Sequence, residues 1–278
     1  MPEPTPERSV PNPVPSDDAP SVLEVGRGDV RFAVVSMSKR AADGDDAGYL
    51  RWHVLDHLPE QFRIDGMRNG TRWFSNGACR AARAASEAPY DAVDHIVAYL
   101  FGGPDDASVD SAIDVFFSLG GSLHAIDRMP VSLPRVEVGG WVLVSKVASP
   151  RVMAGADVVP WRAQRGIYVV IEDVPARGDE VGVDPVGIDP QDLDDLVGVD
   201  GVAGVWRFAA GHDRNPRFDD NHGRTLTICY LDDDPVMVAS RIAARLAARW
   251  AHGRTVPMLA GPFQAVVPWS WDDPEAFA

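Results

Sequence analysis

Short β-branched runs and stretches of helical periodicity alternate along the first half of the chain. Residues 30–37 are almost all apolar and predict a buried strand. In residues 49–61 the apolar positions recur with helical spacing and predict a helix, while Pro59 favours a bend or an early end of that helix. Two more strands are predicted at 66–75 and 95–101. The first elements are therefore strand, helix, strand and strand.

The strongest helix signal of this half lies between Asp105 and the pair Gly120-Gly121. Asp105 is suited to the start of a helix, and the glycine pair is predicted to end it. The inner face of this helix is formed by four apolar residues, Val109, Ile113, Phe116 and Phe117. A fourth strand, at 141–147, completes a βαββαβ order.

The second half of the chain repeats this order. The segment starting at Phe32 aligns with the segment starting at Ile167, and Gly66 aligns with Gly201, both 135 positions apart. Strands are predicted at 166–172, 202–210, 225–231 and 262–269, and helices at 190–197 and after Asp232-Asp-Asp-Pro. Such repetition governs the architecture of a chain.

The predicted fold class is α+β, with two fused ferredoxin-like βαββαβ halves. Each half would have a four-stranded antiparallel sheet with helices on one face, so the bare faces should pack sheet to sheet as a pseudo-dimeric α/β barrel. Residues 1–25 are predicted to be a disordered Pro-rich tail, 26–148 the first half, 149–165 a connector and 166–278 the second half.

The composition excludes some classes of partner and suggests a compartment. The formal net charge is −15, and because phosphate groups are neutralised by clustered Lys and Arg, neither nucleic acid nor an anionic membrane is expected as a partner. No apolar run reaches the roughly 20 residues that span a bilayer, and no signal peptide is recognisable. Two cysteines, Cys79 and Cys229, cannot form a disulfide framework, which predicts a cytoplasmic location.

His53 and His57 are the leading catalytic candidates, together with Arg72. The two histidines are four residues apart and would share one helix face, and imidazole titrates near neutral pH. His57 could take a proton alpha to a carbonyl while Arg72 stabilises the enolate oxygen. A histidine beside a proline at a helix end also fits a simple capping role, and that interpretation stays open.

Trp52, His57, Leu58-Pro59-Glu60, Gly66 and Arg72 resemble the W-x(4)-H-x-P-E … G … R signature of EthD-like members of the dimeric α/β-barrel superfamily. The resemblance implies a cleft for a small, mostly apolar, often aromatic molecule, with His57 as the acid/base residue. Related barrels include monooxygenases, decarboxylases, polyketide cyclases and lactone isomerases. Members usually dimerise to pair two sheets, so the tandem resembles such a dimer made in one chain, and further self-association is left open.

Five residues are predicted to contact a ligand: Trp52, Tyr49, Trp73, Tyr99 and Arg207. Pockets are mostly apolar, so two or three of the aromatic residues could line a cavity, although aromatic residues on strands equally fit the core. Arg207 stands 135 positions after Arg72. The two arginines either bracket one cleft or are structural equivalents in the two halves.

A metal site and a haem site are both considered. His53 and His57 have the spacing of H-E-x-x-H helices but lack the glutamate and an identifiable third ligand, so no metal site is predicted. The segment 63–70 distantly resembles the G-x-x-D-G stretch of dye-decolourising peroxidases, in which case the axial haem ligand would be His124, His212 or His222. We predict no cofactor, and keep the haem-binding protein as a remote alternative.

The predicted function is binding of a small aromatic, polyketide-like or steroid-like compound, with or without catalysis. The catalytic version is a cofactor-free enzyme of proton transfer, cyclisation or decarboxylation in which His57 is the acid/base. A ligand carrier would keep the cleft without needing His57, and an accessory or scaffold protein would have no cleft and would bind a protein through an apolar face. These two alternatives remain open at the level of sequence.

Overall fold

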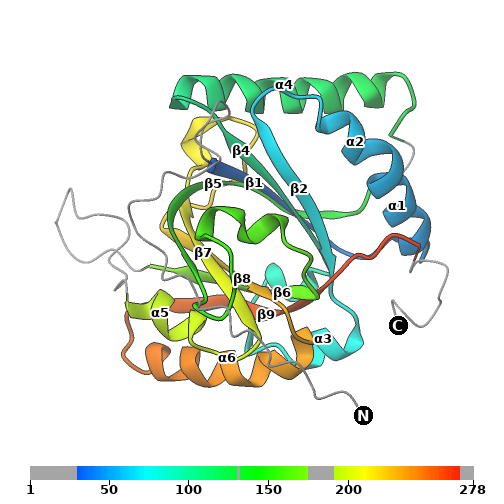
Figure 1. The fold of residues 1–278 in the computed structure, drawn as a ribbon. Helices are drawn as coiled ribbons and strands as arrows, with labels where there is room; N and C mark the ends of the chain where they lie inside the picture. Colours follow the sequence, from blue (N-terminus) through cyan, green and yellow to red (C-terminus); the bar gives the residue numbers. More distant parts are fainter. Residues whose placement is uncertain (1–29, 130–131, 175–190, 270–278) are drawn as a thin grey trace, which may run out of the picture.

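The computed structural model describes residues 30–129, 132–174 and 191–269. Its strands form one antiparallel sheet that closes on itself, because β2 pairs with both β4 and β9 (Figure 1). Around the barrel the strands are β2 (Met67–Phe74), β4 (His95–Gly102), β1 (Val30–Ser38), β5 (Arg135–Ala148), β7 (Val202–Ala210), β8 (Arg224–Leu231), β6 (Gly166–Asp173) and β9 (Val256–Ala265). The short β3 (Ala85–Ser86) adds to β9. The chain is thus an α+β barrel of antiparallel strands.

The two halves use the same strand order. In each half the strands lie in the spatial sequence second, third, first and fourth, which is β2-β4-β1-β5 and then β7-β8-β6-β9. Gly66 and Gly201, predicted as equivalents, both have a positive φ, +96° and +91°. At Gly66 a Cβ would also lie 2.8 Å from the Ala112 side chain. Only glycine adopts this backbone readily at such close range.

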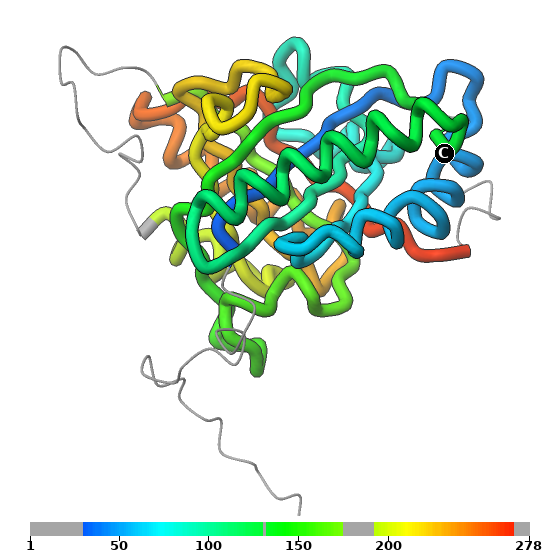
Figure 2. Tube along the Cα trace, turned by 90° about the horizontal axis from the view of Figure 1, so that it is seen from above, coloured from blue at the N-terminus to red at the C-terminus, as the bar shows by residue number. Residues whose placement is uncertain are grey.

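Helices cover the outside of the barrel in two groups. Over the first four strands lie a helical run made of α1 (Asp46–Trp52), a π-turn η2 (His53–His57) and α2 (Leu58–Gln61), and the long α4 (Asp106–Ala125) (Figures 1 and 2). Near the other four lie α3 (Gly77–Ala81), α5 (Gln191–Val197) and α6 (Pro235–Trp250). Short 3-10 turns complete the described elements: η3 (Tyr90–Ala92), η4 (Ala156–Trp161) and η5 (His212–Arg214).

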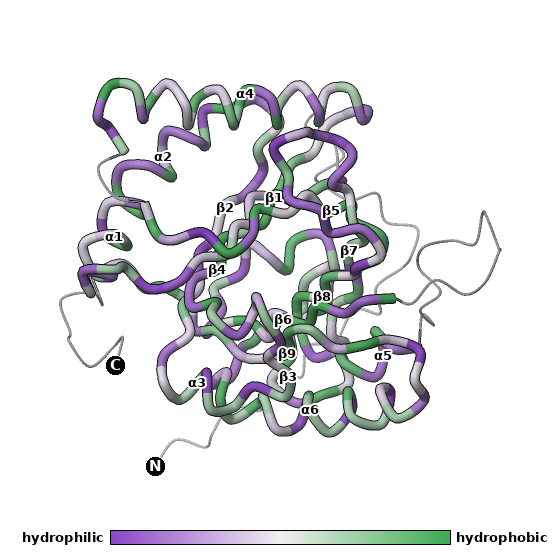
Figure 3. The backbone as a smooth tube through the Cα atoms, turned by 180° about the vertical axis from the view of Figure 1, so that it is seen from behind, coloured by the Kyte–Doolittle hydropathy of each residue, from purple (hydrophilic) through white to green (hydrophobic). Residues whose placement is uncertain are grey.

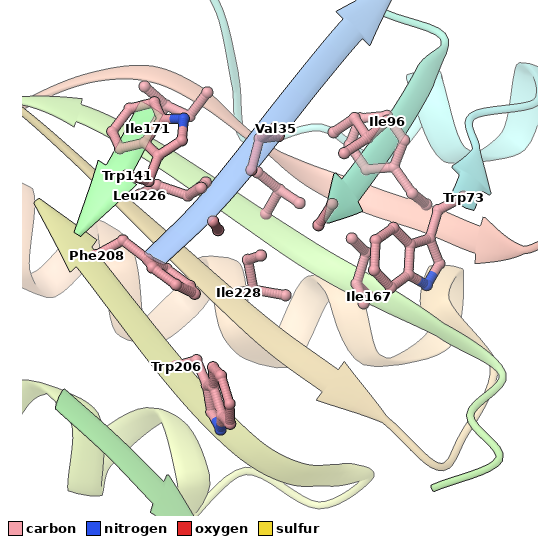
Figure 4. Packing of buried hydrophobic residues seen from close by; sticks show 14 of the residues in the cluster. Val35, Trp73, Ile96, Trp141, Ile167, Ile171, Trp206, Phe208, Leu226 and Ile228 are labelled. Carbon is pink, nitrogen blue, oxygen red and sulfur yellow. The ribbon is translucent and has the colours of Figure 1, made fainter. Parts of the chain in front are cut away.

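The barrel interior is filled by side chains from both halves. Figure 4 shows Trp73, Val35 and Ile96 packed with Ile167, Ile228 and other residues of the second half. In Figure 3 hydrophobic stretches follow the strands between the two helical layers. Burial of each large side chain stabilises the fold by about 1.5–3 kcal/mol relative to exposure. The interior of the barrel is therefore a packed core.

Several predicted boundaries are wrong, among them the start of the fourth strand, which is Arg135 instead of Trp141. Helix α4 runs through Gly120-Gly121 to Ala125, because neither glycine has the positive φ that ends a helix. The last strand is Val256–Ala265 instead of 262–269. Pro262 lies inside it, between the short pairings of β9 with β3 and with β2, where a missing N–H is tolerated.

The predicted helix at 49–61 starts earlier, at Asp46, because the Asp45 carboxylate accepts a hydrogen bond from the Gly48 amide at 2.8 Å. The predicted tail 1–25 lies outside the described residues. Cys79 and Cys229 are buried free thiols. Among the described residues, no helix combines the length and apolar character needed to cross a membrane.

Candidate functional site

A cavity of about 490 Å³ lies in the first half, between the outer face of its strands and the helices that cover them. This volume is typical of pockets for small molecules. Its polar lining includes Tyr49, His53, His57, Gln61, Arg72, Tyr99, Ser36 and Ser38, and its apolar lining includes Trp52, Phe116, Phe117, Val34, Val97 and Leu133. The cavity is separated from the barrel core by the sheet itself.

The helical run over the cavity changes from α to π geometry at His53 and returns to α at Leu58. Such single π-turns are rare and are found often at functional sites. The two histidine rings that face the cavity lie 5.5 Å apart between centroids, in an edge-to-face arrangement. The predicted sharing of one helix face is thus realised, although across a π-turn.

His57 is held by its neighbours in a defined orientation. Its ring stacks on Trp52 with centroids 4.8 Å apart, and the Gln61 amide donates to its Nε2 at 2.9 Å. Its buried Nδ1 has no partner among the described residues. Burial lowers the pKa of His57, with Glu60 opposing and Arg72 adding to the effect. His57 is therefore neutral at pH 7 and able to accept a proton.

His53 lies deeper, with 1% of its surface exposed. Its Nε2 hydrogen-bonds to the Tyr99 hydroxyl at 2.9 Å. Burial, with a contribution from Arg72, lowers the pKa of His53 well below its usual range, and burial raises the pKa of Tyr99. Both groups are neutral at pH 7, so they supply hydrogen bonds without charge.

Arg72 is the buried cation of the site, with 5% of its surface exposed. Its Nη2 donates to the Tyr49 hydroxyl at 2.9 Å, and its guanidinium lies 4.9 Å from the centre of the Tyr49 ring. Nε and Nη1 have no hydrogen-bond partner among the described residues. No Asp or Glu occurs among the described residues that line the cavity. Arg72 therefore offers donors and positive charge to a bound molecule.

The structure brings six of the eight predicted site residues together in this cavity: Tyr49, Trp52, His53, His57, Arg72 and Tyr99. Trp73 and Arg207 do not line it. Trp73 follows Arg72 on β2 and points to the opposite face, into the barrel core (Figure 4). Arg207 lies in the second half, where its Nε donates to Thr227. The two arginines are structural equivalents and do not bracket one cleft.

The register of the strands identifies the site in the second half that corresponds to the cavity. Arg72 is opposite Val97 and Val97 is opposite Ser36, just as Arg207 is opposite Thr227 and Thr227 is opposite Val170. One step further along the same face, Ser38 corresponds to Glu172. In the other direction Tyr99 corresponds to Cys229.

The covering helices α4 and α6 also correspond, because each is capped by an aspartate three residues after its strand, Asp105 and Asp234. Counted from these caps, Gly120 matches Arg249 and Gly121 matches Trp250. Trp250 Nε1 donates to the buried Glu172 carboxylate at 2.6 Å, and Arg249 forms an ion pair with it. Side chains therefore occupy in the second half the space that glycines leave open in the first.

Sequence reasoning missed several residues of the cavity. Gln61, which bonds His57, stands four positions after it, and this spacing is the signal that could have identified it. Gly120 and Gly121 were interpreted as a helix end, yet a Cβ at either would meet nothing within 4 Å. The sequence alone gives no reason to select Ser38 as a site residue, because its role becomes visible only when the structure aligns it with Glu172.

Histidines outside the cavity and the described acidic residues do not form a metal or haem site. Among the described residues no group of three His, Cys, Asp or Glu is placed to hold a metal ion. The haem candidates His124, His212 and His222 are at least partly exposed and do not line the cavity. These three histidines therefore do not fit the axial ligand of a haem bound there.

No protein-family model and no curated protein sequence matches the chain. Solved structures do. A candidate monooxygenase from Fusobacterium nucleatum superposes with a TM-score of 0.50 at 8% identity, covering 86% of this chain and 94% of that chain. An anthrone oxidase-like protein gives a TM-score of 0.48 at 12% identity, covering 86% and 92%. The first likeness shows that the two chains share this barrel fold.

Proposed function

We propose that the first-half cavity binds a small aromatic compound and that His57 moves a proton to or from it without a cofactor. Arg72 would pair with a ligand oxygen that carries or develops negative charge. One observation supports this proposal most directly. Arg72 is buried, has no carboxylate partner among the described residues, and faces the same cavity as a neutral histidine. A neutral base beside a fixed cation suits abstraction of a proton that leaves charge on an oxygen.

The roles of the other lining residues follow from their contacts. Trp52 and Gln61 orient the His57 ring, and Tyr49 orients Arg72. Phe116 and Phe117 of α4 supply an aromatic wall. His53, bonded to Tyr99, would be a positioning residue. This division of roles makes His57 and Arg72 the residues expected to contact the reacting group.

We also propose that the chain is EthD-like and that it consists of two ferredoxin-like halves. The repeated strand order supports the division, and the shared cavity position of Trp52, His57 and Arg72 supports the motif. A cytoplasmic location, suggested by two free thiols, is also part of it.

The proposal is tested by proton exchange on an enolisable aromatic ketone. Anthrone is incubated in D₂O with the protein, and loss of its methylene proton signal is followed by NMR. We expect His57→Gln to slow the protein-dependent exchange about 10²- to 10⁴-fold, the usual contribution of a general base. His124→Gln, a change at an exposed histidine near the end of α4, is the matched control and should exchange like the wild type.

A non-catalytic carrier is the second candidate, because a half-open apolar cavity serves binding equally well. Native mass spectrometry of the protein purified from its own host would find the ligand in both cases. Bound ligand together with unchanged exchange in His57→Gln would reject catalysis and leave the carrier. An empty protein with a stoichiometric protein partner would instead support the scaffold.

A further inference from the structure

The charges around the two equivalent arginines are balanced in one half and not in the other. In the second half, Glu172 and Asp192 both interact favourably with Arg207, and both also form ion pairs with Arg249. Two cations are thus matched by two carboxylates. Burial still lowers the pKa of Arg207, to about 10, despite these partners. The buried Arg207 is thus accompanied by carboxylates that favour its charged form.

In the first half both counter-charges are missing. Ser38 stands where Glu172 stands, and His57 is the residue that precedes Asp192 by 135 positions, the offset that also relates Arg72 to Arg207. Burial keeps His57 neutral, so it neither repels nor balances Arg72. Arg72 and the three positions matched to Arg249, Glu172 and Asp192 therefore carry one positive charge, that of Arg72, and no negative one.

Other acidic side chains near this site are already engaged. Asp46, the buried acid of α1, accepts hydrogen bonds from the Ala41 amide at 2.8 Å and from His95 Nε2 at 2.8 Å. Arg135, the other arginine of the cavity lining, is paired with Asp219 at 3.1 Å. The positive charge that remains uncompensated in the cavity is that of Arg72.

We propose that the natural ligand of this cavity is an aromatic organic anion, a compound such as an aryl carboxylate or an acidic phenol that holds its negative charge on oxygen before any reaction. The inference rests on the proposed function only in taking the cavity as the ligand site. An uncompensated buried charge is costly, and a ligand anion in the cavity that Arg72 lines removes that cost by pairing with the guanidinium.

The residues that line the cavity indicate the shape of the ligand. Trp52 lies on one side, stacked on His57, and Phe116 and Phe117 project from α4. Gly120 and Gly121 leave room along the same helix. Flat rings pack well on such surfaces, so an aromatic anion fits both the charge and the shape of the cavity.

The test compares 2-naphthoate with its neutral isostere 2-naphthamide by isothermal titration calorimetry in a chloride-free buffer. The wild-type protein should bind the carboxylate about 10- to 100-fold more tightly than the amide, the range expected for hydrogen bonds to a charged group. In Arg72→Met the preference should disappear, with the amide affinity little changed. Circular dichroism checks that each variant is folded.

A matched pair of substitutions separates charge from size. Ser38→Glu places a carboxylate where the second half has Glu172, and should abolish carboxylate binding because Arg72 is then internally neutralised. Ser38→Gln adds the same volume without charge and should keep the preference. Equal affinity of the wild type for the two probes, binding of neither probe, or loss of the preference in Ser38→Gln as complete as in Ser38→Glu would each overturn the proposal.

The outcome is separable from that of the acid/base proposal. His124→Gln, at a histidine outside the cavity, should keep both the exchange and the preference for naphthoate over naphthamide, whereas Arg72→Met should lose the preference, which is measured without any proton transfer. An intact preference with no proton exchange in any variant would support the anion site while rejecting catalysis. Proton exchange that depends on His57, without any preference for the carboxylate, would support catalysis and reject the anion site.

Discussion

Arg72 and Arg207 lie at the same point of the same strand order, yet Arg72 faces a cavity and Arg207 faces side chains. Glu172 and the Arg249-Trp250 pair fill the space beside Arg207, whereas Ser38 and two glycines stand at these places in the first half. The backbone frame is the same in both halves. Whether the frame holds a ligand is decided by a few side chains on one strand and one helix.

The difference extends to how each half is covered. In the second half the inner face of α6 is continuous, with Val238, Ile242 and Leu246 all buried. In the first half, the equivalent residues Val109 and Ile113 are buried, but Phe117, the equivalent of Leu246, is only partly buried and lines the cavity. Half of α4 thus serves stability in the same way as α6, and the other half roofs the cavity.

The largest effect should come from closing the cavity. Gly121→Trp places the side chain of Trp250 at the equivalent point of α4, and we expect loss of all measurable binding of 2-naphthoate in calorimetry, because the ring occupies the ligand space. Ser118→Trp, on the exposed side of the same helix, is the control and should bind normally. Normal binding by Gly121→Trp would show that the ligand sits elsewhere.

Removing a buried charge should have different effects on the free energy of unfolding in the two halves. Glu172→Gln leaves Arg207 and Arg249 short of a counter-charge and should lower the free energy of unfolding by about 3 kcal/mol. Arg72→Met removes a cation that lacks a carboxylate partner among the described residues, so the ligand-free protein should lose little stability or gain some. Urea unfolding measures both. Equal losses would mean that Arg72 is compensated in solution.

The third prediction concerns acid. The pKa values of His53, His57 and His95 are lowered by burial, against an ordinary value of 6.5. The unfolded chain therefore takes up protons first as the pH falls below 6.5, so stability is full above that pH and is lost below it. Each histidine contributes a slope of up to about 1.4 kcal/mol per pH unit.

The matching site in the second half, made of Glu172, Asp192, Arg207 and Arg249, contains no histidine. Urea unfolding at a series of pH values should give a shallower slope for His57→Gln than for the wild type. The acid limb of any His57-dependent exchange should likewise lie below pH 6.5, because the neutral base persists there. A limb above 6.5 would contradict the lowered pKa of His57.

The smallest effect is expected at Gly120. A Cβ there meets nothing within 4 Å, so Gly120→Ala should raise the free energy of unfolding by about 0.5–1 kcal/mol through the lower entropy of the unfolded chain. Thermal or urea unfolding measures the change, and naphthoate binding should be nearly unaffected. Destabilisation would indicate that the space beside Gly120 is occupied.

The strands could be predicted because β-branched runs are local features of the sequence. The predicted alignment of Phe32 with Ile167 is wrong by one residue, since Phe32 packs with the covering helices and Ile167 lies in the barrel core. The strand 202–210 has the predicted bounds, and Gly66 and Gly201 are equivalent as expected. The site could be predicted only in part. Trp73 and Arg72 are neighbours in sequence, and only the direction of the pleat assigns one to the core and the other to the cavity.

The continuation of helix α4 through the glycine pair could not be predicted from the sequence. Gly120-Gly121 has the composition of a helix end, but Leu123 is buried beyond it and the helix continues. Likewise the contrast between Ser38 and Glu172 depends on residues of distant elements meeting across a sheet. Such contacts depend on how the strands are aligned across the sheet, which the local periodicity of the sequence does not specify.

The strand pairings that close the barrel bind the two halves into one cooperative unit. β5 pairs with β7 on one side, β2 and β3 pair with β9 on the other, and α3 packs near α6. A chain cut between β5 and β6 would leave each piece with two unsatisfied strand edges, which invite aggregation. Neither piece is expected to persist as a separate domain, and the intact chain should melt in a single transition.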